Sequence, residues 1–233
     1  MGELSLFPPK PVPEVSQADA VDWLRSLEPA SVDMINTDCA YESLEKHRDI
    51  GTTTRLKNDW FPIFPNSRFP ALFAAMFRAL KRDSHLYFWC DAETMFVAKP
   101  IAEAAGFKFW KPLIFDKVAI GMGYHYRATY EFILFFEKGH RNLADRSIPD
   151  VLTATRIRGK YPTEKPEDLA RILVRQSSAP GELVVDPFMG SGAFGAAAVA
   201  EGRRFAGCDV QERAVALAKE RIESARIKEG TIR

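Results

Sequence analysis

Apolar and polar residues follow two alternating patterns along this chain, and the patterns predict alternating strands and helices. Short apolar runs predict buried strands at residues 32–38, 84–90, 107–116, 129–137, 182–186 and 203–209. Apolar residues at helical spacing predict helices at residues 20–28, 68–81, 93–105 and 165–177, behind Gly192, and after the last strand to about residue 226. Such alternation is typical of a mainly parallel sheet that is covered on both faces.

Two features modify this alternation. The strands predicted at residues 107–116 and 129–137 follow each other without a helix, which indicates a hairpin and one antiparallel strand near an edge of the sheet. Residues 42–66 and 139–160 are irregular, and loops of this length are usually functional or mobile. No repeat or clean linker interrupts the chain. We therefore predict an α/β fold with a mostly parallel sheet in one domain, residues 1–233.

Composition indicates a soluble globular protein of the cytoplasm. Of the 233 residues, 46% are hydrophobic and 27% are charged. Strongly apolar runs such as Phe132 to Phe136 are too short to span a bilayer, and the N-terminus lacks the pattern of a signal peptide. The cysteines Cys39, Cys90 and Cys208 stand far apart without CxxC or Cys/His spacing, so we expect neither a metal site nor disulfides. A reducing compartment fits best.

Basic residues are concentrated in one part of the chain, although the net charge is only +1. From Lys117 to Lys160 there are eight Lys or Arg residues against four Asp or Glu residues. Such a segment can bind nucleic acid, and it can equally be an ordinary solvated surface.

Residues 181–210, GELVVDPFMGSGAFGAAAVAEGRRFAGCDV, have the layout of a nucleotide-like cofactor site. A predicted strand ends at Asp186, a turn contains Gly190 and Gly192, and a helix of small residues follows. Glycines let the backbone approach a ligand closely, and Asp209 after the next strand can bind two ribose hydroxyls. Taken alone, the glycines could simply make a tight turn. No Lys-Ser/Thr pair follows them, which argues against ATP.

A second candidate site follows the strand at residues 32–38, in the stretch NTDCAYESLEKHR. An acid at a strand end, two small residues and an aromatic residue suit a site that grips a flat ring. Cys39 has three interpretations: a nucleophile, a metal ligand or a small loop residue. No further ligand stands at a suitable spacing, which disfavours the metal.

Several segments resemble one family, the S-adenosylmethionine-dependent DNA methyltransferases that modify exocyclic amines. DPFMGSG (residues 186–192) resembles their cofactor motif, and TDCAY (residues 37–41) resembles their catalytic motif, usually Asp/Asn/Ser-Pro-Pro-Tyr/Phe. YPTEKP (residues 161–166) resembles the segment that closes over the cofactor in this family. SQADAVDWL (residues 16–24) resembles the acidic turn that meets the adenine of the cofactor, and residues 115–139 resemble the hairpin region of the family. The catalytic motif precedes the cofactor glycines, which is the circularly permuted order of the beta class.

The resemblance implies a Rossmann-like, doubly wound methyltransferase sheet and S-adenosyl-L-methionine as cofactor. It also implies how an extruded adenine would be methylated at N6. Asp38 accepts one N–H of the amine, the carbonyl of residue 39 accepts the other, and Tyr41 offers a ring for stacking, so that the amine nitrogen attacks the sulfonium methyl carbon by direct displacement. The catalytic motif comprises Asp38, Cys39, Ala40 and Tyr41. The residues expected to bind the cofactor are Asp19, Ala20, Asp38, Thr163, Lys165, Pro166, Asp186, Pro187, Phe188, Gly190, Ser191, Gly192, Asp209 and Val210.

Cys39 and Ala40 depart from the family pattern, which usually has prolines there. Proline fixes φ and restrains the residue before it, so its loss is expected to free Asp38 to rotate and to loosen the loop. A displacement of about 1 Å can reduce the rate roughly a hundredfold. Cytosine C5 methyltransferases use a cysteine nucleophile, but theirs follows a proline and their motif order is the reverse. We therefore interpret Cys39 as a small loop residue.

Double-stranded DNA is the expected partner, and two irregular segments are expected to contact it. The candidates are Lys46, His47, Arg48, Arg55, Lys57, His125, Arg127, Arg156, Arg158 and Lys160. The leading hypothesis is a site-specific adenine-N6 DNA methyltransferase, for which a homodimer, a restriction endonuclease partner and an orphan enzyme all remain open. Alternatives are a cytosine-N4 enzyme, a weak or inactive DNA- or cofactor-binding member, and an enzyme that methylates RNA or a protein glutamine.

Overall fold

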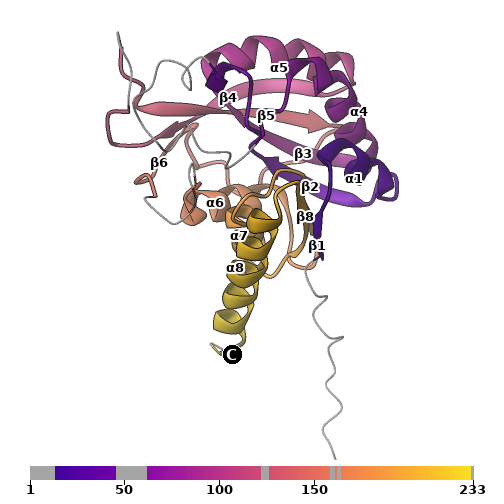
Figure 1. Cartoon of the computed structure of the whole chain (residues 1–233), viewed down its shortest axis with the longest axis vertical. Helices are drawn as coiled ribbons and strands as arrows, with labels where there is room; N and C mark the ends of the chain where they lie inside the picture. Colours follow the sequence, from indigo (N-terminus) through magenta and orange to yellow (C-terminus); the bar gives the residue numbers. More distant parts are fainter. Residues whose placement is uncertain (1–13, 46–61, 122–125, 158–160, 162–163, 232–233) are drawn as a thin grey trace, which may run out of the picture.

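The computed structural model describes residues 14–45, 62–121, 126–157, 161 and 164–231 (Figure 1). An eight-stranded sheet runs through this part of the chain, in the order β1-β8-β7-β2-β3-β5-β4-β6. The strands are β1 (Glu14–Gln17), β2 (Val32–Thr37), β3 (Leu80–Cys90), β4 (Lys108–Asp116), β5 (Tyr130–Lys138), β6 (Val151–Thr153), β7 (Leu183–Asp186) and β8 (Arg204–Asp209).

Strand β5 is antiparallel to both of its neighbours, β3 and β4, and the other neighbouring pairs are parallel. In the β4–β5 hairpin, Phe115 pairs with Glu131 and Ile114 with Phe132, and the register shifts between Phe109 and Lys111. The predicted α/β class, the mostly parallel sheet and the antiparallel hairpin strand near one edge are therefore confirmed. The parallel neighbours have long crossover connections, which the helices supply.

The helices form one layer on each face of the sheet (Figure 1). The layer that contains α1, α4 and α5 packs on one face, and the layer that contains α6, α7 and α8 packs on the other. The far end of α8 extends beyond the body of the molecule (Figure 1). The helix bounds are α1 (Ala20–Ser26), α4 (Phe69–Ala79), α5 (Ala92–Ala104), α6 (Glu167–Ser177), α7 (Ala193–Ala200), α8 (Glu212–Thr231) and the 3-10 helix η1 (Asn66–Arg68).

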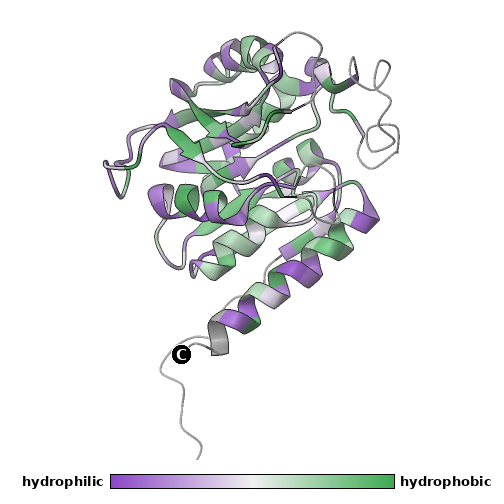
Figure 2. Cartoon of the chain, turned by 90° about the vertical axis from the view of Figure 1, so that its left-hand side faces the viewer, coloured by the Kyte–Doolittle hydropathy of each residue, from purple (hydrophilic) through white to green (hydrophobic). Residues whose placement is uncertain are grey.

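Two apolar clusters, one on each face, enclose the central strands. Every residue of β2 is buried, as are the last seven residues of β3. Phe73 and Phe88 pack in the first cluster with α4, whereas Trp89 and Phe194 pack in the second with α7. Hydrophobic residues gather between the layers, and the outer helix faces carry the hydrophilic ones (Figure 2). Burial on both faces favours apolar residues in these strands, and the buried polar residues of β2, Asp33, Asn36 and Thr37, each have a side-chain hydrogen-bond partner.

Two strands were not anticipated. β1 (EVSQ) and β6 (VLT) are short edge strands with few apolar residues, and residues 151–153 lie inside a segment that was expected to be irregular. Each is defined by its partner: β1 pairs with β8, and β6 pairs with β4. Local periodicity does not reveal such strands, because their hydrogen bonds depend on a neighbour distant in sequence. Within the described residues, no helix is long and apolar enough to cross a membrane.

The parallel strands end at one edge of the sheet, which we call the carboxyl edge. Asp38 directly follows β2, while Asp186 and Asp209 end β7 and β8. Because β5 is antiparallel, its first residues also lie at this edge, where Tyr130 pairs with Asp116. Loops at the carboxyl edge of parallel sheets usually bind the ligands of α/β proteins.

Candidate active site

The two motifs found in the sequence meet at the carboxyl edge because β2 and β7 are neighbours in the sheet. The hydroxyl of Thr37 donates a hydrogen bond of 2.7 Å to Oδ1 of Asp186, and both side chains are buried. The same oxygen accepts the backbone N–H of Phe188 at 3.0 Å. Burial raises the pKa of Asp186 to about 8. The end of β2 is thus tied directly to the start of the glycine turn.

The glycine turn has the backbone freedom that the sequence indicated. Gly190 and Gly192 adopt φ values of +48° and +78°, which residues with a side chain rarely adopt. A Cβ atom on Gly192 would lie 2.8 Å from Cα of Ala218, so this glycine allows α7 to pack closely on α8. Gly190 faces the site instead, and its N–H donates to Oδ2 of Asp209 at 3.0 Å.

Asp209 is held so that its carboxylate can still accept further hydrogen bonds. Oδ1 accepts the N–H of Gln211 at 2.9 Å and Oδ2 accepts that of Gly190 at 3.0 Å. Each carboxylate oxygen has two lone pairs, so each can accept one more hydrogen bond, for example from a ligand hydroxyl. The carboxylate and the exposed glycine backbone fit a ligand that carries a ribose. Burial raises the pKa of Asp209.

Tyr161 covers the glycine turn from the other side. Its ring lies 3.2 Å from the place where a Cβ on Gly190 would be. Burial raises the pKa of Tyr161, and the nearby carboxylates of Asp209 and Asp38 raise it further. Arg221 on α8 fixes the segment between this tyrosine and α6, because it pairs with Glu164 and donates to Oγ of Ser191 at 3.4 Å.

Asp19 caps helix α1 and also binds an arginine. Oδ1 accepts the N–H groups of Val21 and Asp22, and Arg68 makes two hydrogen bonds of 2.8 Å to the two carboxylate oxygens. The hydrogen bond from Arg68 lowers the pKa of Asp19. The N–H of Ala18 donates to the carbonyl of Asp209 at 3.1 Å, which places the start of α1 beside the end of β8.

The remaining cofactor candidates are distributed around these groups. Ala20 is buried at the start of α1, Val210 is partly exposed behind β8, and Pro187 lies in the turn with Phe188. Phe188 packs edge-on against Phe64 at 5.0 Å between ring centroids. Pro166 is the N-cap residue of α6. Thr163 lies outside the described residues.

Asp38 belongs to a chain of four alternating charges. Lys165 Nζ lies 2.6 Å from Oδ2 of Asp38 and 2.9 Å from Oε2 of Glu131. Lys117 Nζ lies 2.8 Å from Oε1 of Glu131. Burial raises the pKa of Asp38 to about 6, although Lys165 opposes this shift. Burial alone would raise the pKa of Glu131 too, but Lys165 and Lys117 outweigh it and hold that pKa at about 2.

Cys39 is buried in the core and does not face solvent as a reactive thiolate. Burial and the negative charge of Asp38 raise the pKa of its thiol well above the usual value. A neutral thiol is a poor nucleophile, which supports its interpretation as a small loop residue. Among the described residues, no group of three or more His, Cys, Asp or Glu side chains is arranged to hold a metal ion.

The loop after Asp38 is better restrained than the absence of its prolines suggested. The carbonyl of Ala40 accepts the N–H of Phe64 at 2.7 Å, and Tyr41 pairs with Phe64 in a parallel bridge. Ser43 donates to Asp91, which also caps α5. The ring of Tyr41 is 8% exposed, so it offers little surface for stacking in this conformation.

Few of the predicted DNA-binding residues fall within the described part of the chain. Arg127 is exposed at the carboxyl edge and donates to the carbonyl of Gly121 at 2.8 Å, and Arg156 is exposed behind β6. The other candidates, Lys46, His47, Arg48, Arg55, Lys57, His125, Arg158 and Lys160, lie outside the described residues. The basic segment, residues 117–160, spans both edges of the sheet. Residues 139–150 follow β5 at the edge opposite to the carboxyl edge, and β6 then runs back towards the carboxyl edge.

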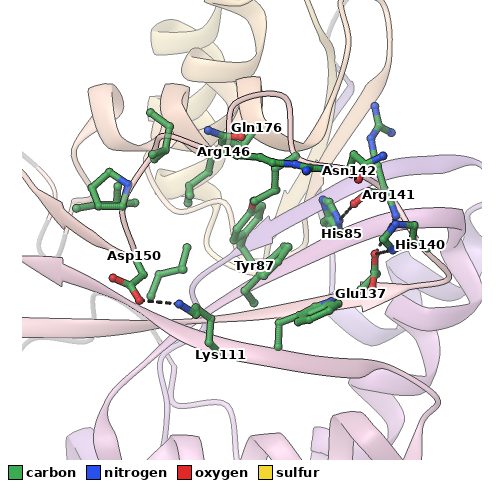
Figure 3. A pocket seen from close by; sticks show the side chains of 18 residues that line it. His85, Tyr87, Lys111, Glu137, His140, Arg141, Asn142, Arg146, Asp150 and Gln176 are labelled. Carbon is green, nitrogen blue, oxygen red and sulfur yellow. Dashed lines mark hydrogen bonds and ion pairs between the residues drawn. The ribbon is translucent and has the colours of Figure 1, made fainter.

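A pocket of about 340 Å³ lies under residues 139–150, away from all the predicted site residues. Tyr87, Phe135 and Leu173 line its interior. Figure 3 shows the ion pair of Lys111 and Asp150 beside it, with a distance of 2.7 Å between Nζ and Oδ2. Its position identifies it as a feature separate from the carboxyl edge.

Sequence reasoning missed four residues that shape the site. Glu131 and Lys117 complete the charge chain, Tyr161 covers the glycine turn, and Thr37 links the two motifs. Glu131 stands inside an apolar strand, and this acid in an otherwise apolar run was an available signal. Thr37 and Tyr161 stand in TDCAY and YPTEKP, segments that resemble family motifs, but their own contacts were not predictable because the partners lie far along the chain. Lys117 had no signal of its own.

Comparison with known proteins identifies the family. The family described as DNA methylase, whose members are the N6/N4 methyltransferases, matches residues 32–220. The chain belongs to this family. The chain is therefore a DNA methyltransferase by membership, and S-adenosyl-L-methionine is its methyl donor.

Individual relatives agree with this assignment. The chain is 26% identical to the DNA adenine methyltransferase YhdJ of Escherichia coli over 249 residues, which covers 91% of this chain and 83% of YhdJ. It is similar to the structure of TTHA0409 from Thermus thermophilus in complex with S-adenosyl-L-methionine, with a TM-score of 0.70, 23% identity, and coverage of 92% and 94%. The cytosine-N4-specific PvuII methyltransferase is similar in fold, with a TM-score of 0.67, 14% identity, and coverage of 92% and 91%.

Proposed function

We propose that this DNA methyltransferase transfers a methyl group to N6 of adenine in double-stranded DNA, after the base has been flipped out of the helix. The observation that carries the proposal is the position of Asp38 beside the glycine turn. The two sites lie on adjacent strands and are joined by the hydrogen bond between Thr37 and Asp186. An acceptor for an amine therefore lies next to the place suited to the cofactor.

The chemistry requires hydrogen-bond acceptors. An exocyclic amine is a poor nucleophile, because its lone pair is delocalised into the aromatic ring. In the proposed mechanism, the carboxylate of Asp38 accepts one N–H of the amine, and the carbonyl of Cys39 accepts the other. The lone pair then points out of the ring plane, and positioning and charge stabilisation supply most of the rate enhancement. The nitrogen that has gained the methyl group carries a positive charge and an extra proton, which the Asp38 carboxylate can take.

When bound, S-adenosyl-L-methionine would supply an electrophilic methyl group, and the carbon–sulfur bond that breaks would leave a neutral thioether. The residues that fit this cofactor are Asp209 for the ribose hydroxyls and the backbone of Gly190 for close approach. Asp19, capping α1 and fixed by Arg68, lies beside the end of β8 and is suited to the adenine end. Tyr161 borders the same space, between Asp209 and Asp38.

Adenine is proposed over cytosine on two grounds. The catalytic motif of this chain begins with Asp, which leans towards adenine in the family that it resembles, and YhdJ is described as an adenine methyltransferase. DNA contacts are assigned to the exposed Arg127 and Arg156 at the carboxyl edge. Arginine side chains there would bind phosphates and hold the duplex over Asp38.

Incubation of unmethylated genomic DNA with the protein and isotopically labelled S-adenosyl-L-methionine tests the proposal. The DNA is digested to nucleosides, and mass spectrometry identifies the product. Labelled N6-methyladenine is expected; N4-methylcytosine would correct the base, and label only in RNA or protein would refute DNA as the substrate. Cofactor binding without any transfer would instead identify an inactive member.

Two substitutions assign the catalytic role. Asp38→Ala should lower the transfer rate at least a hundredfold, because one of the two amine acceptors is removed, while cofactor binding persists. Asp150→Ala is the matched control, since the side chain of Asp150 is 52% exposed and pairs with Lys111 beside the pocket that is separate from the carboxyl edge. Equal activity of the two variants would contradict the role of Asp38.

A further inference from the structure

The four charged residues at the carboxyl edge form one continuous chain, Lys117–Glu131–Lys165–Asp38. The contact distances along the chain are 2.8, 2.9 and 2.6 Å. The side chains are 16%, 21%, 9% and 18% exposed, so all four are largely removed from water. They come from four separate segments: the start of the β4–β5 loop, strand β5, the segment before α6 and the loop after β2.

Stability alone does not explain this arrangement. Removing charges from water is costly, and apolar residues of similar volume often stabilise a protein as well as or better than a buried ion pair. The neighbouring positions on β5 are apolar, and Lys165 lies over the ring of Trp89 at 5.6 Å, so an apolar replacement would find apolar neighbours. The function of Asp38 is therefore a better explanation for the buried charges than stability.

The geometry indicates that reason. The closest contact between Lys165 and Asp38 joins Nζ to Oδ2, at 2.6 Å. Lys165 is itself fixed, because Glu131 binds it and Lys117 binds the other oxygen of Glu131. The carboxylate of Asp38 is thus anchored at Oδ2, and a carboxylate has further lone pairs that can accept an N–H group.

We propose that Lys165 is the positioning residue for Asp38 in methyl transfer, and that Glu131 holds Lys165 in place for this task. This inference rests on the proposed function of Asp38. It assigns Lys165 to the catalytic carboxylate, whereas the sequence motif assigned it to the cofactor. It also explains how a motif with Cys39 and Ala40 in place of prolines keeps its acid in one orientation, since a salt bridge replaces the restraint of the ring.

The charge of Asp38 depends on the same contacts. Burial raises its pKa, Lys165 and Lys117 lower it, and Glu131 raises it. Loss of Lys165 should therefore favour the protonated acid, which cannot accept an N–H as a carboxylate does. Loss of the Glu131 charge should have the opposite effect. The titratable groups around Asp38 are Lys165, Glu131, Lys117, Asp186, Cys39, Tyr41, Cys90 and Tyr161.

The test compares Lys165→Gln and Glu131→Gln with the wild-type protein. Single-turnover methyl transfer is measured from pH 5 to pH 9 with saturating cofactor and DNA. Lys165→Gln should move the acidic limb of the rate profile to higher pH by at least about one unit, and Glu131→Gln should move it to lower pH. Lys165→Arg keeps the charge and should restore the wild-type limb, even if its maximal rate is lower.

The titration of Asp38 is also measured without turnover. The carboxyl carbon of Asp38, assigned by its loss in Asp38→Asn, is followed by NMR in each variant. The same opposite shifts are expected, so this measurement decides the inference even if the wild type transfers no methyl group to DNA and the proposed function fails. Lys111→Gln is the matched control, since Lys111 forms a half-exposed pair with Asp150 and should leave both profiles unchanged.

Two results would overturn the inference. One is a rate that falls equally at every pH in Lys165→Gln while Asp38 titrates as in the wild type. The other is a loss of cofactor affinity in Lys165→Gln with an unchanged rate at saturating cofactor, which would return Lys165 to cofactor binding. Circular dichroism of each variant establishes that it is folded, and a misfolded Lys165→Gln leaves Lys165→Arg and Glu131→Gln to decide.

Discussion

Gly192 offers a direct test of the close contact between the glycine turn and α8. In Gly192→Ala, the new Cβ would lie 2.8 Å from Cα and 2.9 Å from Cβ of Ala218, well inside the 3.4 Å at which ordinary contact begins. The backbone of α8 would have to move, because the obstructing atoms are not the end of a flexible side chain. The substitution also places alanine at a φ of +78°.

The expected cost has two parts. An L-residue in the left-handed region costs about 1–2 kcal/mol, and overpacking of a well-packed contact costs about 1–3 kcal/mol. Gly181 separates them, because its φ is +84° but nothing lies within 4 Å of its hypothetical Cβ. Gly181→Ala should therefore lose about 1–2 kcal/mol, and Gly192→Ala about 2–5 kcal/mol. The lower entropy of the unfolded chain affects both variants equally and cancels in their difference.

Equilibrium unfolding in guanidinium chloride measures both variants against the wild type. The free energies of unfolding should differ between the two variants by about 1–3 kcal/mol, which corresponds to roughly 2–12 °C in Tm for a chain of this size. Gly192→Ala should also weaken cofactor binding, because α8 carries Arg221, which holds the segment over the glycine turn. Equal losses in the two variants would refute the contact with α8 as the reason for glycine at position 192.

Three further predictions concern single side chains. Burial lowers the pKa of His85 to about 4, so below pH 6.5 the unfolded state binds a proton that the folded state excludes. Between pH 6.5 and pH 4, the free energy of unfolding of the wild type should therefore fall by up to about 3 kcal/mol more than that of His85→Gln. Parallel stability curves of the two proteins in pH-dependent denaturation would contradict this. Tyr161→Ala should change cofactor affinity at least threefold in calorimetry, because the ring covers Gly190, and an unchanged affinity would place Tyr161 outside the cofactor site. Cys39→Ser should keep the rate of methyl transfer within about threefold of the wild type, because the buried thiol is neutral. A loss of activity beyond about a thousandfold would instead support Cys39 as a nucleophile.

The central elements were predictable because their signals are local. Strand β2 and the later part of β3 are buried on both faces, and such strands are rich in apolar residues, as the Met34–Ile35 pair and the stretch from Leu86 to Cys90 are. The glycine turn was visible because only glycine readily adopts the positive φ values found at Gly190 and Gly192. Both candidate motifs therefore appeared in the sequence as strand ends followed by unusual residues.

The basic segment and the edge strands were less predictable. The excess of basic over acidic residues predicted a DNA-contacting segment over residues 139–160. In the structure, residues 139–150 follow β5 at the edge opposite to Asp38, and only after β6 does the chain return to the carboxyl edge. A charge pattern gives no information about which end of a strand a loop follows, because that depends on strand direction.

The sequence by itself determined the α/β class, the order of strands and helices, and the acids and glycines that suit a methyl transfer site. Tertiary structure alone decided that Lys165 and Glu131 meet Asp38, that Tyr161 covers Gly190, and that β1 and β6 extend the sheet. The physical reason is range. Burial and backbone conformation act on a residue and its near neighbours, whereas ion pairs and strand pairing join groups that only the folded chain brings within a few ångströms.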